Sequence, residues 1–155
     1  MSENKQQENG AMDIVQIMKY LPHRPPFLLI DKLISSSGID SAKGVKYLSA
    51  GDFFFDGHFP GKPQMPKSLL LEVIAQAGAA GVLSAPEYQG KYILFASIDK
   101  CQFGRAPVPG DILEISTELI SLKRGMGKIK ASCCVGEEKL AEGLFTFALS
   151  DTAQS

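Results

Sequence analysis

The chain has 155 residues, of which 45% are hydrophobic and 21% are charged, and its formal net charge is −1. This length and composition suit a single globular domain with a buried core. The charge balance gives no indication of a nucleic-acid partner, because proteins that bind DNA or RNA usually carry a basic excess.

The N-terminal sequence and the cysteines bear on location. Residues 1–11 are polar and lack the basic-then-apolar layout of a secretion signal, so we expect a disordered tail before one domain at residues 12–151. Cys101, Cys133 and Cys134 are odd in number and two are adjacent, which favours reduced thiols over a disulfide framework or a zinc site. These features predict a cytoplasmic protein.

The first third of the chain predicts a short helix followed by β-structure. Asp13 can cap a helix whose apolar residues share a face, and this helix ends near Leu21 because a proline follows. Residues 27–34 are predicted as the first strand, and residues 44–48 continue the β-structure after a Ser/Gly turn. Residues 49–66 are predicted to be a loop, since glycines and prolines recur there.

Residues 67–85, KSLLLEVIAQAGAAGVLSA, predict one long helix that begins after Pro66 and stops before Pro86. The helix is apolar nearly all round, so we expect it to be a buried central helix with small residues that let a sheet approach closely. Glu72 and Gln76 interrupt its apolar run, which falls short of the roughly 20 residues that span a bilayer. We therefore expect no membrane contact.

The second half of the chain is rich in β-branched and aromatic residues, and its connections are short and turn-like. Short connections imply antiparallel hairpins. The predicted strands are residues 92–98, 101–103, 112–122, 128–135 and 140–149. The predicted fold class is α+β, with one buried helix wrapped by a strongly curved, mostly antiparallel sheet.

Glu72 is the first candidate for chemistry. It lies in a helix predicted to be apolar on every side, and no Lys or Arg lies within one helical turn of it. Burial without a cation favours the protonated form of a carboxyl group, which suits a general acid. Gln76, one turn further on, can hydrogen-bond to Glu72 and orient it. The alternative is a buried glutamate that backbone groups or water satisfy.

His58 is the second candidate, and His23 is the only other histidine. Histidine exchanges protons near neutral pH, and the Gly and Pro residues around His58 predict a rigid loop that suits a catalytic side chain. The alternative is an ordinary surface-loop histidine. The proline-rich setting of His23 indicates a structural turn. The sequence has no GxSxG, P-loop or Rossmann motif, and it predicts neither a metal nor a cofactor.

Residues 57–78, GHFPGKPQMPKSLLLEVIAQAG, resemble the active-site segment of the FabZ-type 3-hydroxyacyl-[acyl-carrier-protein] dehydratases. Three further segments agree with that family in order and spacing, and the resemblance covers roughly residues 12–150. These segments are LPHRPPFLLIDK, FASIDKCQF and APVPGDIL.

The resemblance implies a hot-dog fold and the dehydration of 3-hydroxyacyl-[acyl-carrier-protein] to the trans-2-enoyl product in fatty acid biosynthesis. It also implies a homodimer, often assembled further into a hexamer as a trimer of dimers. His58 matches the catalytic histidine of one protomer, and Glu72 matches the catalytic acid of the other. Gln76 matches the glutamine that positions the acid, and Gly61 is a supporting residue of the same motif.

One position departs from the family pattern. Lys67 stands where the family usually has glycine, whose backbone N–H helps to hold the thioester carbonyl. Lys67 keeps that N–H but disfavours a positive φ. Three outcomes stay open: weaker catalysis, an altered substrate set, or an outward Lys67 that meets a phosphate or the carrier protein.

Acyl-carrier protein is acidic, so a basic rim would favour its docking. The candidates for this rim are Lys62, Lys67, Lys100, Arg105, Arg124 and Lys128. The candidates for the lining of an acyl tunnel are Leu94, Phe95, Ile98 and Val108, for which plain core packing is the alternative. Two rival functions remain, a hot-dog acyl thioesterase and a non-catalytic or specialised-pathway protein that binds acyl-carrier protein.

Overall fold

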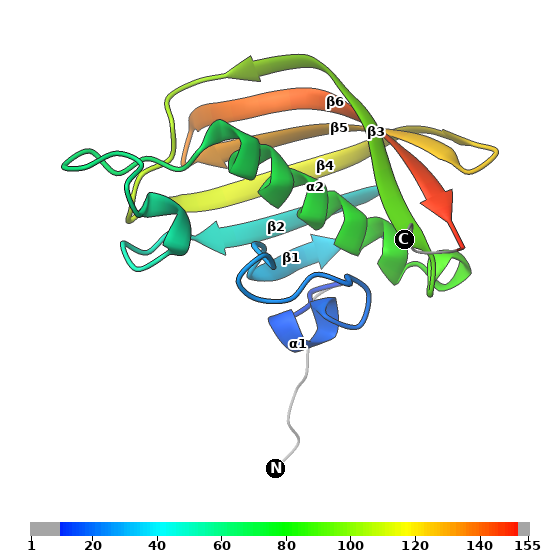
Figure 1. Cartoon of the computed structure of the whole chain (residues 1–155). Coiled ribbons are helices and arrows are strands. Elements are labelled where there is room, and N and C mark those ends of the chain that lie inside the picture. Colours follow the sequence, from blue (N-terminus) through cyan, green and yellow to red (C-terminus); the bar gives the residue numbers. More distant parts are fainter. Residues whose placement is uncertain (1–9, 152–155) are drawn as a thin grey trace.

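The computed structural model describes residues 10–151 and places one long helix inside a curved sheet (Figure 1). The predicted α+β architecture is confirmed. The elements in chain order are α1 (Ile14–Ile17), β1 (Lys32–Ser36), β2 (Ser41–Tyr47), η1 (Phe53–Phe55), α2 (Lys67–Ser84), η2 (Pro86–Tyr88), β3 (Tyr92–Phe103), β4 (Ile112–Lys123), β5 (Met126–Val135) and β6 (Glu138–Ser150).

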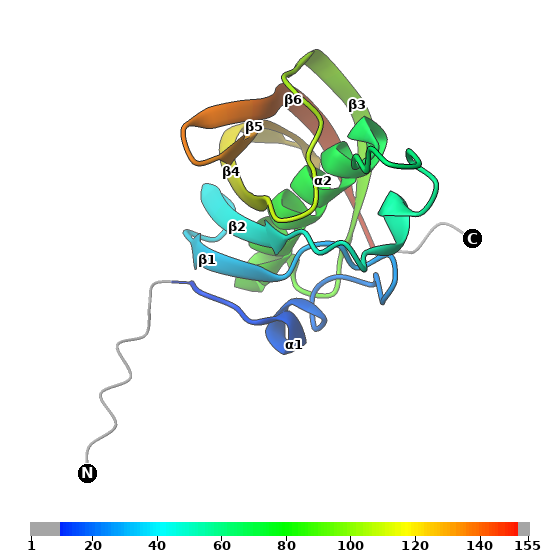
Figure 2. The ribbon, with the colours of Figure 1, turned by 90° about the vertical axis from the view of Figure 1, so that its left-hand side faces the viewer.

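The sheet has six antiparallel strands in the order β1-β2-β4-β5-β6-β3. It curls around α2, so the helix lies within the curve of the sheet (Figure 2). The β4–β5 hairpin turns at Arg124 and Gly125, whose φ values of 51° and 76° suit a tight hairpin. β1 and β3 are the two edges of the sheet.

The helix α2 forms the centre of the core. Twelve of its 18 residues are buried, as predicted from its apolar composition. A Cβ atom added at Gly81 would lie 2.7 Å from the Cβ of Ala42, so only glycine lets β2 approach this closely. By length and composition α2 resembles a membrane-spanning helix, but 67% of it is buried inside the fold.

Several boundaries differ from the predictions. The first strand begins at Lys32 instead of residue 27, because the side chain of Gln76 takes the backbone N–H groups that a strand ladder would use. Residues 92–98 and 101–103 form one strand, β3, with an irregularity where Lys100 adopts a φ of 51°. The helix capped by Asp13 ends at Ile17.

The N-terminal tail predicted at residues 1–11 lies mostly outside the described residues. Within the described residues, Met12 forms a bridge with Leu33.

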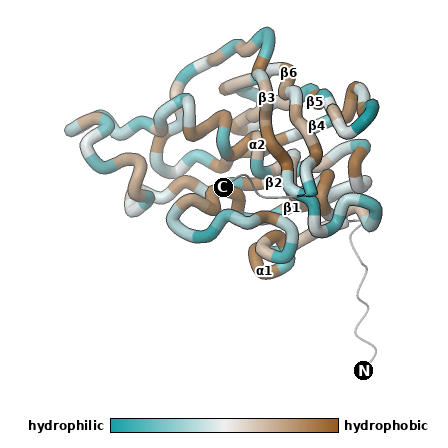
Figure 3. Tube along the Cα trace, turned by 45° about the vertical axis from the view of Figure 1, so that its right-hand side comes forward, coloured by the Kyte–Doolittle hydropathy of each residue, from teal (hydrophilic) through white to brown (hydrophobic). Residues whose placement is uncertain are grey.

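The edge strand β3 differs from the interior strands. In β4, β5 and β6, buried side chains alternate with more exposed ones, whereas no residue of β3 is buried. Figure 3 shows hydrophobic stretches along β3 as well as along α2. The large side chains of Phe95, Ile98 and Phe103 are 36%, 38% and 39% exposed. A long apolar edge without a neighbour is a surface suited to pairing with another strand.

Candidate active site

Glu72 lies on the second turn of α2, where Gln76 holds its carboxyl group. The side-chain nitrogen Nε2 of Gln76 donates to Oε1 of Glu72 at 2.9 Å and to the carbonyl oxygen of Phe27 at 2.8 Å. The side-chain oxygen of Gln76 accepts from the N–H of Leu29 at 2.8 Å and of Ile30 at 3.4 Å. Gln76 is 1% exposed, so this buried amide uses all its polar atoms. The predicted hydrogen bond between the two side chains is present.

His23 is the residue that the sequence analysis missed at this site. Its Nε2 lies 3.5 Å from Oε1 of Glu72, and each of the two side chains is 30% exposed. Glu72 is therefore less buried than predicted, and its second neighbour is an imidazole. The two residues lie far apart in the sequence, and a proline-rich segment gives no signal of such a contact. The turn assigned to His23 is thus only part of its structure.

A cavity of about 160 Å³ opens beside Glu72 and His23. Its inner wall is mainly apolar and comes from α2 and the start of β3: Ala75, Ala79, Leu83, Tyr92, Ile93 and Phe95. Of the four predicted tunnel residues, Phe95 lines this cavity, and Leu94, Ile98 and Val108 do not. Alternation along β3 separates Leu94 from Ile93 and Phe95. Ile98 lies further along the strand, and Val108 lies in the loop that follows it.

His58 lies in the loop before α2 and is held by hydrogen bonds to Gln64. Its Nδ1 lies 2.8 Å from the carbonyl oxygen of Gln64, and its own carbonyl oxygen accepts from the N–H of Gln64 at 2.8 Å. A carbonyl oxygen only accepts, so Nδ1 carries the proton and donates, and Nε2 is left as the free basic nitrogen. The His58 ring stacks on Phe59 with centroids 4.1 Å apart.

A neighbouring loop braces the His58 loop. The N–H of Met65 donates to the carbonyl oxygen of Pro107 at 2.8 Å. That second loop is fixed by Asp111, which accepts from the guanidinium of Arg105 at 2.7 Å and from the N–H of Val108 at 2.9 Å. Partial burial raises the pKa of Asp111, but these hydrogen bonds and the charge of Arg105 outweigh it and lower that pKa below its ordinary value.

The described residues 10–151 contain no hydrogen bond or ion pair between His58 and Glu72. His58 meets the loop that precedes α2, whereas Glu72 meets α2 and the segment after α1. Gly61, with a φ of +71° and open space around it, belongs to the turn of the His58 loop. The His58 loop and the surroundings of Glu72, here called the two half-sites, are therefore held separately within this chain.

Lys67 begins α2 without a positive φ, so its side chain imposes no backbone strain. Its ammonium nitrogen lies 5.2 Å from the ring centroid of Phe103 at the end of β3. Among the described residues, the N–H groups of Lys67 and Ser68 have no backbone acceptor, as expected for the first turn of a helix. Two donors therefore point out of the start of α2.

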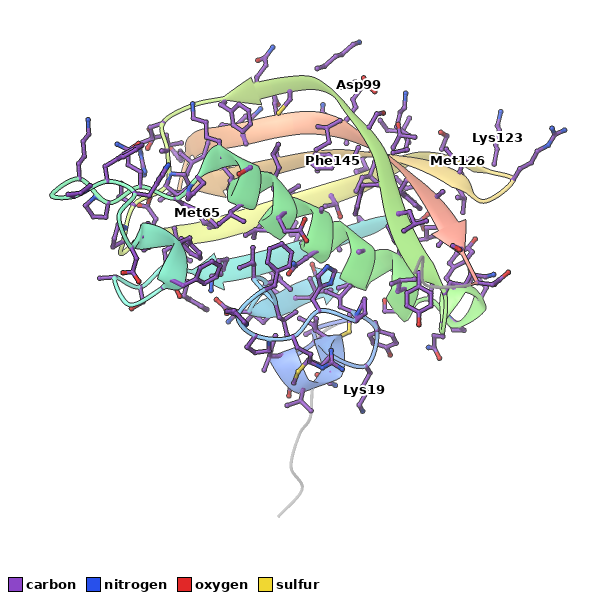
Figure 4. All side chains as sticks on the ribbon, viewed as in Figure 1. Lys19, Met65, Asp99, Lys123, Met126 and Phe145 are labelled. Atoms are coloured by element: carbon purple, nitrogen blue, oxygen red, sulfur yellow. The ribbon has the colours of Figure 1, made fainter. Side chains whose placement is uncertain are left out.

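The predicted basic rim is dispersed in one chain. Figure 4 shows Lys123 and Met126, which flank the predicted Arg124, at the opposite end of the molecule from Met65 near the start of α2. Lys62 and Lys67 lie at the Met65 end, and Lys100 lies on β3. Arg105 is already paired with Asp111 at 2.7 Å and Glu138 at 2.9 Å.

The sequence matches a family and close relatives over most of its length. The model of the FabA-like domain matches residues 21–143. The chain is 47% identical over 137 residues to the 3-hydroxyacyl-[acyl-carrier-protein] dehydratase FabZ of Caldicellulosiruptor saccharolyticus, covering 88% of this chain and 98% of that protein. It is 45% identical over 140 residues to the protein of the same name from Moorella thermoacetica, covering 90% and 98%.

Solved structures share the fold at low sequence identity. The dehydratase heterocomplex ApeI:P from Xenorhabdus doucetiae aligns with a TM-score of 0.74 and 17% identity, covering 85% of this chain and 89% of that chain. A hypothetical thioesterase from Streptococcus pneumoniae aligns with a TM-score of 0.59 and 11% identity, covering 79% and 87%. These alignments bear out the predicted hot-dog fold, and they do not choose between the two activities.

Proposed function

Because this chain belongs to the FabA-like family, as a FabZ-type 3-hydroxyacyl-[acyl-carrier-protein] dehydratase, we propose that His58 and Glu72 perform the proton transfers of its reaction. The enzyme removes water from 3-hydroxyacyl chains on acyl-carrier protein and forms the trans-2-enoyl product of fatty acid biosynthesis. The observation that carries the residue assignment is the pair of half-sites, one with a free imidazole nitrogen and one with a fixed carboxyl group.

In the mechanism we propose, Nε2 of His58 takes a proton from the carbon next to the thioester carbonyl. Glu72 gives a proton to the departing 3-hydroxyl group, directly or through a water. The electron pair of the broken C–H bond forms the new double bond as the C–O bond breaks, and water leaves. The free N–H groups of Lys67 and Ser68 would stabilise the negative charge that develops on the carbonyl oxygen.

We propose that the two half-sites meet in a homodimer formed through β3. The cavity beside Glu72 is lined by the start of β3, and the loop that braces His58 follows the end of β3. If two β3 edges pair antiparallel, the start of one strand lies next to the end of the other. The partner's His58 loop is then brought toward this chain's Glu72, and the exposed apolar side chains of β3 are covered. The hexamer stays a prediction.

The same pairing organises the remaining predictions. It would place the partner's Lys62 and Lys67 near this chain's Arg124 and Lys128, so the basic rim for an acidic carrier protein would come from two chains. Arg105 serves the loop in this proposal, because two carboxylates already neutralise it. The apolar cavity would receive the acyl chain. We propose a cytoplasmic location, which suits the three free cysteines.

The test is to incubate the purified protein with a 3-hydroxyacyl carrier protein, or with the matching N-acetylcysteamine thioester, and to measure the conjugated enoyl thioester. His58→Ala and Glu72→Gln are each expected to lower kcat by roughly 10²- to 10⁴-fold, because each removes one proton transfer. Release of a free thiol would instead support a thioesterase, and unchanged substrate would support a binding protein.

A further inference from the structure

His23 contacts Glu72 but takes no part in the proposed proton transfers. Its Nε2 lies 3.5 Å from Oε1 of Glu72, slightly beyond an ordinary hydrogen bond. Both side chains line the same cavity. Catalytic hydrogen bonds are often long in a free enzyme and shorten when substrate binds.

The segment that carries His23 is firmly held. The guanidinium of Arg24 donates to the carbonyl oxygens of Met18 at 3.0 Å, of Leu21 at 2.8 Å and of His23 at 2.7 Å. The His23 ring also stacks on Phe27, with centroids 6.1 Å apart and planes at 30°. The imidazole thus faces Glu72 from a backbone that several hydrogen bonds fix.

The two nitrogens of His23 have different surroundings. Nδ1 is buried and has no hydrogen-bond partner among the described residues. A proton on Nδ1 would be a buried donor without an acceptor, which costs about 1–3 kcal/mol. With the proton on Nε2, Nδ1 is instead a buried acceptor without a donor, so Nδ1 is unsatisfied in either neutral form, but only this form directs an N–H at Glu72. A positively charged His23 would favour the ionised carboxylate of Glu72, whereas the neutral form adds no such charge.

Gln76 and His23 both direct their nitrogens at Oε1 of Glu72. We propose that His23 is a positioning residue which, together with Gln76, occupies Oε1 so that Oε2 holds and transfers the catalytic proton. This inference rests on the proposed role of Glu72. In the reaction, the Oε2–H bond breaks and its proton joins the departing hydroxyl as water, while Nε2 of His58 holds the proton from the substrate carbon.

The first test compares His23→Gln with His23→Met, because the two replacements have similar length and only Gln keeps an N–H donor. His23→Met is expected to lower kcat by roughly 10- to 100-fold, as for other misplaced catalytic groups, with KM nearly unchanged. His23→Gln is expected to recover most of this loss. Equal losses in both variants, or a loss confined to KM, would assign His23 a packing role and overturn the inference.

The second test needs no variant. The chain has only two histidines, so the nitrogen NMR shifts of both imidazoles can be resolved and assigned in the wild-type protein. His23 is expected to carry its proton on Nε2 and His58 on Nδ1. A proton on Nδ1 of His23 would contradict the inference. A wild type that forms no enoyl product removes the proposed function and this inference together, whereas an active wild type with a fully active His23→Met removes only the inference.

Discussion

The two half-sites differ in how the fold builds them. Glu72 stands on the central helix, and its neighbour Gln76 is 1% exposed and tied by hydrogen bonds to the segment at residues 27–30. His58 stands on a loop outside the sheet, stacks on Phe59, which is 51% exposed, and depends on Gln64 for its orientation. Glu72 is therefore fixed by the core of its own chain, and His58 is fixed by local loop contacts.

This difference indicates a division of labour across the dimer that we propose. The half-site with Glu72 also has the apolar cavity, which in this proposal binds and orients the acyl chain. The half-site with the base contributes one nitrogen and the N–H groups at the start of α2. The comparison predicts that substitutions in the half-site of Glu72 lower the free energy of unfolding. Substitutions in the half-site of His58 should lower activity with little change in stability.

The largest effect is expected from an experiment that places His58 and Glu72 of one site on different chains. His58→Ala and Glu72→Gln are each expected to be nearly inactive alone. After the two variants are mixed and allowed to exchange subunits, half of the dimers combine one of each and regain one intact site. The mixture is expected to recover about a quarter of wild-type activity, as random pairing of a symmetric dimer requires. Each variant mixed with itself is the control, and no recovery would mean that both groups of a site come from one chain.

The next prediction tests whether the hydrogen bonds of Gln76, beside Glu72, stabilise the core. Gln76→Leu leaves the carbonyl oxygen of Phe27 and the N–H of Leu29 without their partners. Buried polar groups that lose their partners cost about 2–4 kcal/mol together, so denaturant unfolding should shift by that amount and kcat should fall. Gln89→Leu on the surface is the control. An unchanged unfolding midpoint would show that the Gln76 bonds do not support the fold.

A smaller effect is expected from the loop that braces His58. Asp111→Asn weakens the contact with Arg105 that fixes the loop behind His58, and it should lower kcat a few-fold. The effect on stability should stay below about 1 kcal/mol, because the Arg105 side chain is 36% exposed. Asp40→Asn, whose side chain forms no ion pair in the described residues, is the control.

The pH dependence of this effect has a definite sign. The pKa of Asp111 is lower in the folded protein than in the unfolded chain, so its contribution is present above the unfolded pKa. It is lost as the pH falls through the folded pKa. The Tm difference between wild type and Asp111→Asn should therefore be full near pH 7, begin to shrink at about pH 4, the ordinary range of an aspartate, and vanish only below the lowered pKa of the folded protein. A difference that persists in acid would contradict this assignment.

The sequence predicts the half-site of Glu72 better than the half-site of His58. An apolar run that is interrupted only by Glu72 and Gln76 predicts the buried helix. Helical periodicity places these two side chains one turn apart, which predicts the hydrogen bond between them. The contact with His23 depends on how a distant segment folds back on α2, and no local pattern encodes it. The exposed β3 edge likewise becomes visible only when the strand order is known.

The smallest expected effect concerns Lys67, where this chain departs from the family pattern. Its backbone N–H survives any substitution except proline. Its side chain lies over Phe103 and takes no part in the proposed proton transfers, so Lys67→Ala should change kcat on the N-acetylcysteamine substrate less than about twofold. If the ammonium group meets the acidic carrier, KM for the carrier-linked substrate should rise, and its salt dependence should weaken. Lys19→Ala, at a distant position on the surface (Figure 4), is the control. A contact with the carrier cannot affect a substrate that lacks the carrier. An equal loss of kcat on both substrates would therefore mean that the Lys67 side chain supports catalysis at the start of α2.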